Sequence, residues 1–120
     1  MAKILVHITH GPEHPTRAAL GFLVAKAAIE EGHSVTLFLA GDAVQLMRDG
    51  VLDHMSGLGT GKLRDSYDAV VASGAKIYLS GMSAKARGLI ETEIESKPVE
   101  FAMPNVPVQL AIEHDRMFTY

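Results

Sequence analysis

Three histidines lie close together near the start of the chain. His7, His10 and His14 form an H-x2-H-x3-H pattern, and imidazole is the commonest metal ligand in proteins. The pattern does not suit a helix, because Pro12 and Pro15 interrupt the segment and His7 belongs to an apolar run. We therefore expect no metal site, and we interpret the three imidazoles as polar groups that line the end of a strand.

A glycine-rich segment, GLGTGK at residues 57–62, has the composition of a phosphate-binding loop. A P-loop has the pattern G-x4-G-K-[ST] and directly follows a strand. Here the spacing is G-x3-G-K, and Leu63 stands where the motif requires a hydroxyl. The segment after Gly11 also lacks the further glycines of a dinucleotide-binding fingerprint. We predict that residues 57–62 form a flexible loop.

The turn at residues 80–83 is the strongest candidate for a binding site. Ser80, Gly81 and Ser83 are small, so the backbone N–H groups of a following helix are accessible to an anion. Lys85 and Arg87 add positive charge nearby. The same residues also fit a plain strand-to-helix turn with Ser83 as the helix N-cap. A serine-hydrolase elbow, G-x-S-x-G, is absent because Lys85 occupies the last position of the motif.

These candidate residues lie between short apolar runs that alternate with helix-like segments. Apolar runs of this kind are typical of strands that are covered on both faces. They predict strands at residues 3–9, 34–40, 75–80, 99–103 and 116–120. The alternation indicates an α/β protein, a three-layer α/β/α sandwich with a mostly parallel five-stranded sheet. Ligands bind beyond the carboxyl ends of such strands, where His10 and Ser80 are expected to lie.

The intervening segments have helical periodicity. They predict helices at residues 16–31, 43–48, 63–74, 82–88 and 107–113. In the first helix one apolar stripe is widened by a second set of residues: Leu20, Leu23, Val24 and Ala27, with Phe22, Ala25 and Ile29. Residues 49–62 lack clear periodicity, and we predict a long loop with room for one helical turn.

Several apolar side chains fall in and beside this predicted loop: Met47, Val51, Leu52, Met55 and Leu58. Soluble monomers rarely expose such a group together. The side chains either form an interface between copies of the chain or pack within the protomer, and the sequence leaves both open.

Composition excludes several classes of protein. The chain has 120 residues, which fits one domain over residues 1–120, and it has no cysteine for disulfides, thiolate metal sites or nucleophilic catalysis. Eleven Lys and Arg against 14 Asp and Glu give a net charge of −3, without the basic stripe that nucleic acid requires. No apolar stretch approaches the roughly 18 residues of a membrane span. We expect a cytoplasmic protein with no cofactor, no membrane contact and no nucleic-acid partner.

Over essentially its full length, the chain resembles the DsrE/DsrF-like proteins, which include TusD-type sulfur-relay subunits and YchN-type proteins. The resemblance rests on the Ala-rich helix at residues 17–28, the LFL and DAV tripeptides at residues 37–39 and 42–44, the turn at residues 80–88, and the final DRMFTY. It implies a parallel sheet with strand order 4-3-2-1-5. It also implies assembly into trimers or hexamers, sometimes with paralogues.

In the sulfur-relay members, the resemblance implies a cysteine at the end of the third strand that carries a persulfide and passes it to a partner protein. That position corresponds to Ser80, and the second cysteine of some members corresponds to Ser83. A hydroxyl cannot replace the thiolate that persulfide transfer needs, because serine stays protonated at neutral pH. We therefore expect no relay activity.

Two functions of different classes remain. The first is a non-catalytic, homo-oligomeric DsrE-like module that binds a small anionic ligand or serves a protein partner in sulfur metabolism. Its candidate ligand-binding residues are His10, Ser80, Gly81, Ser83 and Arg87. The alternative is an enzyme that uses His10, Ser80 and Arg87 at the strand ends. In the implied strand order one strand separates His10 from Ser80, a spacing of about 10 Å, which disfavours a Ser-His pair.

Overall fold

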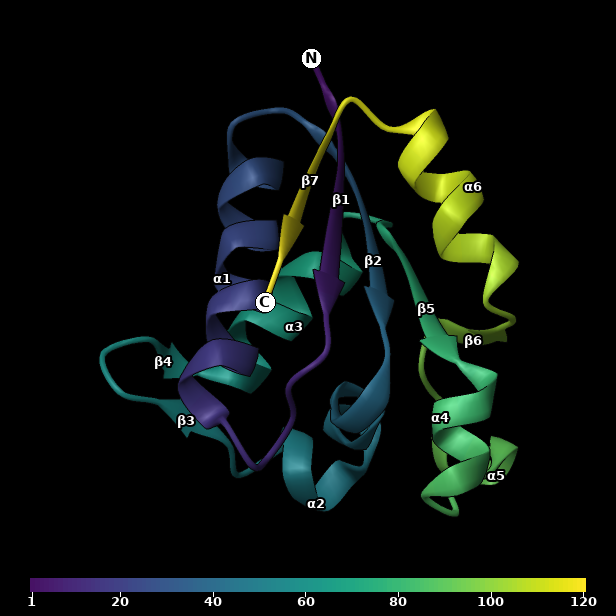
Figure 1. Ribbon diagram of the computed structural model, residues 1–120. Coiled ribbons are helices and arrows are strands. Elements are labelled where there is room, and N and C mark those ends of the chain that lie inside the picture. Colours follow the sequence, from purple (N-terminus) through teal and green to yellow (C-terminus); the bar gives the residue numbers. More distant parts are fainter.

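The computed structural model covers residues 1–120 and shows a parallel sheet between two layers of helices (Figure 1). The sheet consists of β1 (Lys3–Ile8), β2 (Ser34–Leu39), β5 (Lys76–Ser80), β6 (Val99–Ala102) and β7 (Arg116–Thr119). Their order across the sheet is β6-β5-β2-β1-β7, and every neighbouring pair is parallel. In chain order this is 4-3-2-1-5, so the expected fold and strand order are confirmed.

Helices cover both faces of this sheet (Figure 1). The helices α1 (Pro15–Glu30) and α3 (Leu63–Ala72) lie on one face, and α6 (Asn105–Glu113) lies on the other. Near the carboxyl ends of the strands are α4 (Gly81–Ala86) and α5 (Glu91–Ile94). None of the helices combines the length and hydrophobicity needed to cross a membrane.

The hydrophobic core lies between the sheet and the helices α1 and α3. Strand side chains point alternately to the two faces of a sheet, so every second residue of each strand enters this core. These strand residues are Ile4, Val6, Ile8, Val35, Leu37, Leu39, Ile77 and Leu79. The intervening residues Leu5, His7 and Phe38 consequently belong to the face that α6 covers.

The buried face of α1 differs from the predicted apolar stripe. Its most buried side chains are Ala18, Ala19, Phe22 and Ala25, whereas Leu20, Leu23 and Val24 are half-buried and Ala27 is exposed. The helix is apolar on most of its surface, so periodicity alone did not separate the two stripes. Small residues determine which stripe is buried. A Cβ on Gly21 would lie 2.6 Å from the Ile8 side chain, so the face that carries Gly21 can approach the sheet closely.

Residues 49–62 are more regular than the predicted loop. They contain the short helix α2 (Asp49–Leu52) and an antiparallel pair of strands, β3 (Ser56–Gly57) and β4 (Gly61–Lys62). The backbone N–H of Leu58 donates to Thr16 Oγ1 of α1 at 3.0 Å, which holds the hairpin against that helix. Gly59 and Gly61 have φ of 79° and 75°, a conformation that favours glycine, so the glycine-rich segment is explained by its turn.

Most of the apolar side chains in this region pack within the protomer. A 3₁₀ helix, η1 (Gly41–Met47), replaces the helix predicted at residues 43–48. Met47, Leu52 and Met55 are buried and Val51 is half-buried, because η1 and α2 fold against the core. Leu58 alone among the five is fully exposed, at 92%. As a group, these residues therefore give no evidence for an interface.

Candidate functional site

Ser80 ends β5, and its hydroxyl caps the helix that follows. Ser80 Oγ accepts a hydrogen bond from the backbone N–H of Ser83 at 3.1 Å. The prediction of Ser83 as N-cap is therefore wrong, because α4 begins at Gly81 with no intervening loop. The cap satisfies one of the N–H groups that every helix leaves free in its first turn.

Ser83 links α4 to the turn that follows β2. Its Oγ accepts a hydrogen bond from the backbone N–H of Gly41 at 2.8 Å. Gly41 has a φ of 58°, in the left-handed region that favours glycine, at the point where the chain leaves β2 for η1. The side chain of Ser83 thus ties the ends of two neighbouring strands together.

Arg87 lies over the same turn and is held by two acceptors. Its Nε donates to Asp42 Oδ1 at 2.9 Å, and its Nη1 donates to the carbonyl oxygen of Ser83 at 3.1 Å. The Arg87 side chain is 28% exposed, so solvent still reaches the guanidinium. An anion that binds here must therefore compete with the Asp42 carboxylate.

Arg48, which belongs to no sequence motif, extends this network to α5. Its Nη1 donates to Glu93 at 2.5 Å, its Nε to Gln45 at 2.8 Å, and its Nη2 to the carbonyl oxygen of Arg87 at 2.6 Å. Two of these partners are 39 and 45 residues away in sequence, so no local pattern could have revealed the role of Arg48.

The loops after β1 and β2 are in direct contact through Gly11. A Cβ at this position would lie 2.1 Å from the carbonyl oxygen of Asp42, so only glycine fits. The backbone N–H of Gly11 donates to Glu13 Oε1 at 2.7 Å. The loop that carries His10 therefore adjoins the residue that holds Arg87.

His10 itself interacts with its own loop. Thr9 Oγ1 lies 3.4 Å from His10 Nδ1, and the rings of His10 and His14 meet edge to face with centroids 5.3 Å apart. Strand β2 lies between β1 and β5, and no hydrogen bond joins His10 to Ser80 or Arg87. The structure thus groups Ser80, Gly81, Ser83 and Arg87 at one turn and leaves His10 in the neighbouring loop.

The remaining histidine of the N-terminal pattern has a different environment. The ring of His7 packs edge-on against Phe38, with centroids 5.9 Å apart. Burial lowers the pKa of His7, because the low-polarity surroundings disfavour the charged imidazolium. No group of three or more His, Asp or Glu side chains comes close enough to hold a metal ion.

An apolar hollow of about 360 Å³ opens beside α4. Its lining comes from α4, the segment after it and β6: Gly81, Ala84, Lys85, Gly88, Leu89, Ile90, Glu91 and Phe101. A Cβ on Gly81 would have no heavy atom closer than 3.6 Å, so the backbone of the turn is accessible here. The volume is near the lower end of the usual range for small-molecule sites.

Comparison with known proteins identifies the family of this chain. A model of the DsrE/DsrF-like family matches residues 2–120. The chain belongs to this family. Two solved structures resemble this DsrE-like chain over 100% of both chains: the ychN protein from E. coli, with a TM-score of 0.78 and 21% identity, and MTH1491 from Methanobacterium thermoautotrophicum, a protein of unknown function, with a TM-score of 0.72 and 13% identity. At these identities the likeness concerns the fold.

One sequence relative is longer than the DsrE-like chain. The uncharacterized protein MJ0760 of Methanocaldococcus jannaschii is 30% identical over 93 residues. The match covers 78% of this chain but 34% of that protein. The DsrE-like chain thus spans about a third of this relative.

Proposed function

We propose that this chain is a non-catalytic DsrE-like module that accompanies sulfur metabolism or binds a small anionic ligand, without transferring persulfide sulfur. The single observation that carries the proposal is that Ser80 stands at the end of β5 and that its hydroxyl caps α4. The resemblance assigns this position to the carrier cysteine, and here a hydroxyl stands there and caps α4 at 3.1 Å from the Ser83 nitrogen.

Ser80 also lacks the partners of a catalytic serine. A serine nucleophile needs an adjacent base that removes its proton. The hydrogen-bond partner of Ser80 Oγ is a backbone N–H, and neither an imidazole nor a carboxylate is bonded to it. His10 is bonded within its own loop and Arg87 holds Asp42, so nothing favours the alternative of an enzyme built from these groups.

The ligand of this proposal is small and anionic. Arg87 and Lys85 supply positive charge at the turn, and Lys85, though not Arg87, also lines the hollow beside Gly81. Because Arg87 is bonded to Asp42, binding would exchange one carboxylate for another acidic group at the same guanidinium. This exchange favours a ligand with oxygen atoms that can accept two parallel hydrogen bonds.

Assembly into a homotrimer or homohexamer is the second part of the proposal. No residue of α6 is buried, and large apolar side chains are exposed from the segment before α6 to β7. They are Met103, Val108, Ile112, Met117 and Phe118, with exposed fractions of 57%, 60%, 80%, 53% and 43%. Met117 lies on the face that α6 covers, whereas Phe118 lies on the α1 face, where it lines a hollow with Val24 and Ala28. Exposed apolar side chains of this kind are typical of interfaces. Another copy of the chain is the occupant that the family resemblance suggests.

A persulfide-transfer assay tests the first part of the proposal. The wild-type chain, incubated with a low-molecular-weight persulfide donor, should show no stable added sulfur by mass spectrometry. The Ser80→Cys variant should gain sulfur, because it restores a thiol at the start of a helix, where thiolates are stabilised. Ser73→Cys, an exposed position at the end of α3, is the matched control for labelling of any accessible thiol. Sulfur on the wild-type chain would contradict the proposal, as would equal labelling of the two variants.

A further inference from the structure

Strand β6 forms a free edge of the sheet. Its register pairs Val99–Ala102 with β5 alone, and no other backbone hydrogen bond involves these four residues. The outward-facing N–H and C=O groups of β6 are therefore available to another strand. Such an edge is a template for an added chain unless the protein covers it.

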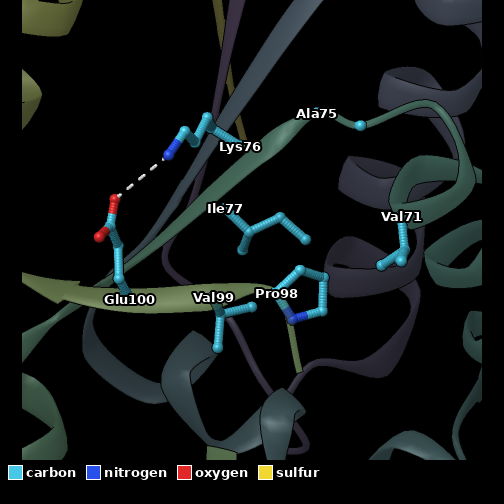
Figure 2. A pocket seen from close by; sticks show the side chains of 8 residues that line it. Val71, Ala75, Lys76, Ile77, Pro98, Val99 and Glu100 are labelled. Atoms are coloured by element: carbon cyan, nitrogen blue, oxygen red, sulfur yellow. Dashed lines mark ion pairs between the residues drawn. The ribbon is translucent and has the colours of Figure 1, made fainter. Parts of the chain in front are cut away.

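Two hollows that share lining residues follow this edge, and together they are called the groove. At the amino end of β6 a hollow of about 330 Å³ lies between β5, β6 and the end of α3. Figure 2 shows Lys76 and Glu100 pointing toward one another and away from the apolar side chains of Val71, Ile77 and Pro98, and Val99 also lines this hollow. A second hollow of about 360 Å³ shares Val99 and Glu100 with the first. The hollow beside α4 adjoins the second through Glu91 and Phe101, but it also contains Lys85 and is not part of this groove.

The middle of the groove is acidic. Its charged lining residues are Glu91, Glu95, Lys97 and Glu100. The Lys97 side chain is only 6% exposed and donates to Asp49 Oδ1 at 2.6 Å, so its charge is already compensated. Glu100 has a single cationic neighbour, Lys76, at 3.8 Å between largely exposed side chains, which is a weak pair in water. The carboxylates of Glu91, Glu95 and Glu100 thus dominate the groove.

We propose that β6 and its acidic groove bind an extended, basic segment of another protein by strand addition. Backbone hydrogen bonds to β6 supply affinity, and alternate side chains supply specificity. Side chains on the α5 side of the sheet meet the apolar hollow at Val99 and the carboxylates of Glu91 and Glu95. Side chains on the α6 side meet Glu100. This partner differs from the small ligand and from the second copy proposed above.

Charge disfavours a second copy of this chain as the occupant of β6. If two β6 strands paired edge to edge, the acidic grooves of both copies would face one another and Glu100 would approach its equivalent. Like charges on paired strands are destabilising. Pro98, directly before β6, also lacks the backbone N–H that would extend such a pairing. A basic segment meets the same edge with complementary charge.

The test uses nuclear magnetic resonance on the isotopically labelled full chain. The probe is an acetylated and amidated hexapeptide of alternating lysine and valine. We expect saturable shifts of the Val99–Ala102 amides and no shifts with the peptide in which glutamate replaces lysine. A lysine–valine peptide with N-methyl groups on alternate residues should bind at least about tenfold more weakly, since each lost backbone hydrogen bond contributes roughly 1 kcal/mol.

Matched variants separate this groove from general charge attraction. Glu91→Gln/Glu95→Gln/Glu100→Gln should weaken binding about tenfold. Glu30→Gln/Glu31→Gln/Glu113→Gln changes the net charge equally at exposed positions outside the groove and should bind like the wild type. Equal effects of the two triple variants would overturn the proposal. So would unchanged affinity of the N-methylated peptide, shifts centred on another surface, or β6 amides already protected by a neighbouring copy.

Discussion

Ser80, Ser83 and Arg87 use their polar atoms to hold the protein together. Ser80 caps α4, Ser83 binds the Gly41 backbone and Arg87 binds Asp42. No buried side-chain nitrogen or oxygen lacks a partner anywhere in the chain. Side-chain types alone suggested an anion site, but both serine hydroxyls accept backbone N–H groups and Arg87 Nε donates to Asp42. A ligand that takes over Arg87 Nε must therefore replace its bond to Asp42.

His7 makes stability depend on pH. Burial lowers its pKa below the usual value of 6.5, so the unfolded chain takes up a proton more readily than the folded chain. The contribution of neutral His7 is complete above pH 6.5 and is lost as the pH falls through 6.5 toward the folded-state pKa. We expect the thermal midpoint to be lower at pH 5 than at pH 7.5, as measured by circular dichroism.

A pair of variants assigns this effect to His7. The His7→Gln variant should show a smaller difference between the two midpoints, because glutamine does not titrate. His54→Gln is the control, since His54 is exposed and should leave the wild-type difference intact. An unchanged pH dependence in His7→Gln would contradict the assignment.

At the scale of elements, apolar runs located the strands well. The five observed strands agree with the predicted ranges to within one residue at either end. The runs are informative because a strand in a parallel sheet is covered on both faces and so lacks polar alternation. The strands β3 and β4 were missed, since two residues each are too few for any periodic pattern.

The orientation of α1 is a testable point at this scale. Phe22 is fully buried, whereas Leu23 on the neighbouring stripe is half-buried. Phe22→Ala should lower the free energy of unfolding by about 3–5 kcal/mol, because it leaves a cavity in the core. Leu23→Ala should cost less than about 1.5 kcal/mol. Urea denaturation of both variants measures the difference, and a larger cost at Leu23 would contradict the observed orientation.

At the scale of the whole molecule, the two edges of the sheet differ in the polarity of their exposed side chains. The β7 side carries exposed apolar side chains, among them Met117 and Phe118, and the β6 side carries carboxylates. An apolar surface suits a permanent neighbour, and a charged groove suits a partner that binds reversibly. We therefore propose the region of α6 and β7 as the assembly surface and β6 as the partner-binding edge.

Light scattering tests the assembly. We expect the mass of a trimer or hexamer for the wild type. Val108→Glu/Ile112→Glu should give smaller species with an unchanged circular dichroism spectrum, because both side chains are exposed in the protomer. Leu58→Glu, at an exposed hairpin position, should leave the assembly intact. A wild-type monomer at high concentration would contradict this part of the proposal.

By itself, the sequence determined the class of fold, the ends of the main strands, and the absence of any thiol at Ser80. These properties depend on residue type and on local periodicity, which a single chain displays directly. Tertiary structure decided which stripe of α1 is buried, that Ser80 rather than Ser83 caps α4, and that Arg48 joins three segments. Each of these depends on which distant backbone approaches, and sequence spacing does not specify that approach.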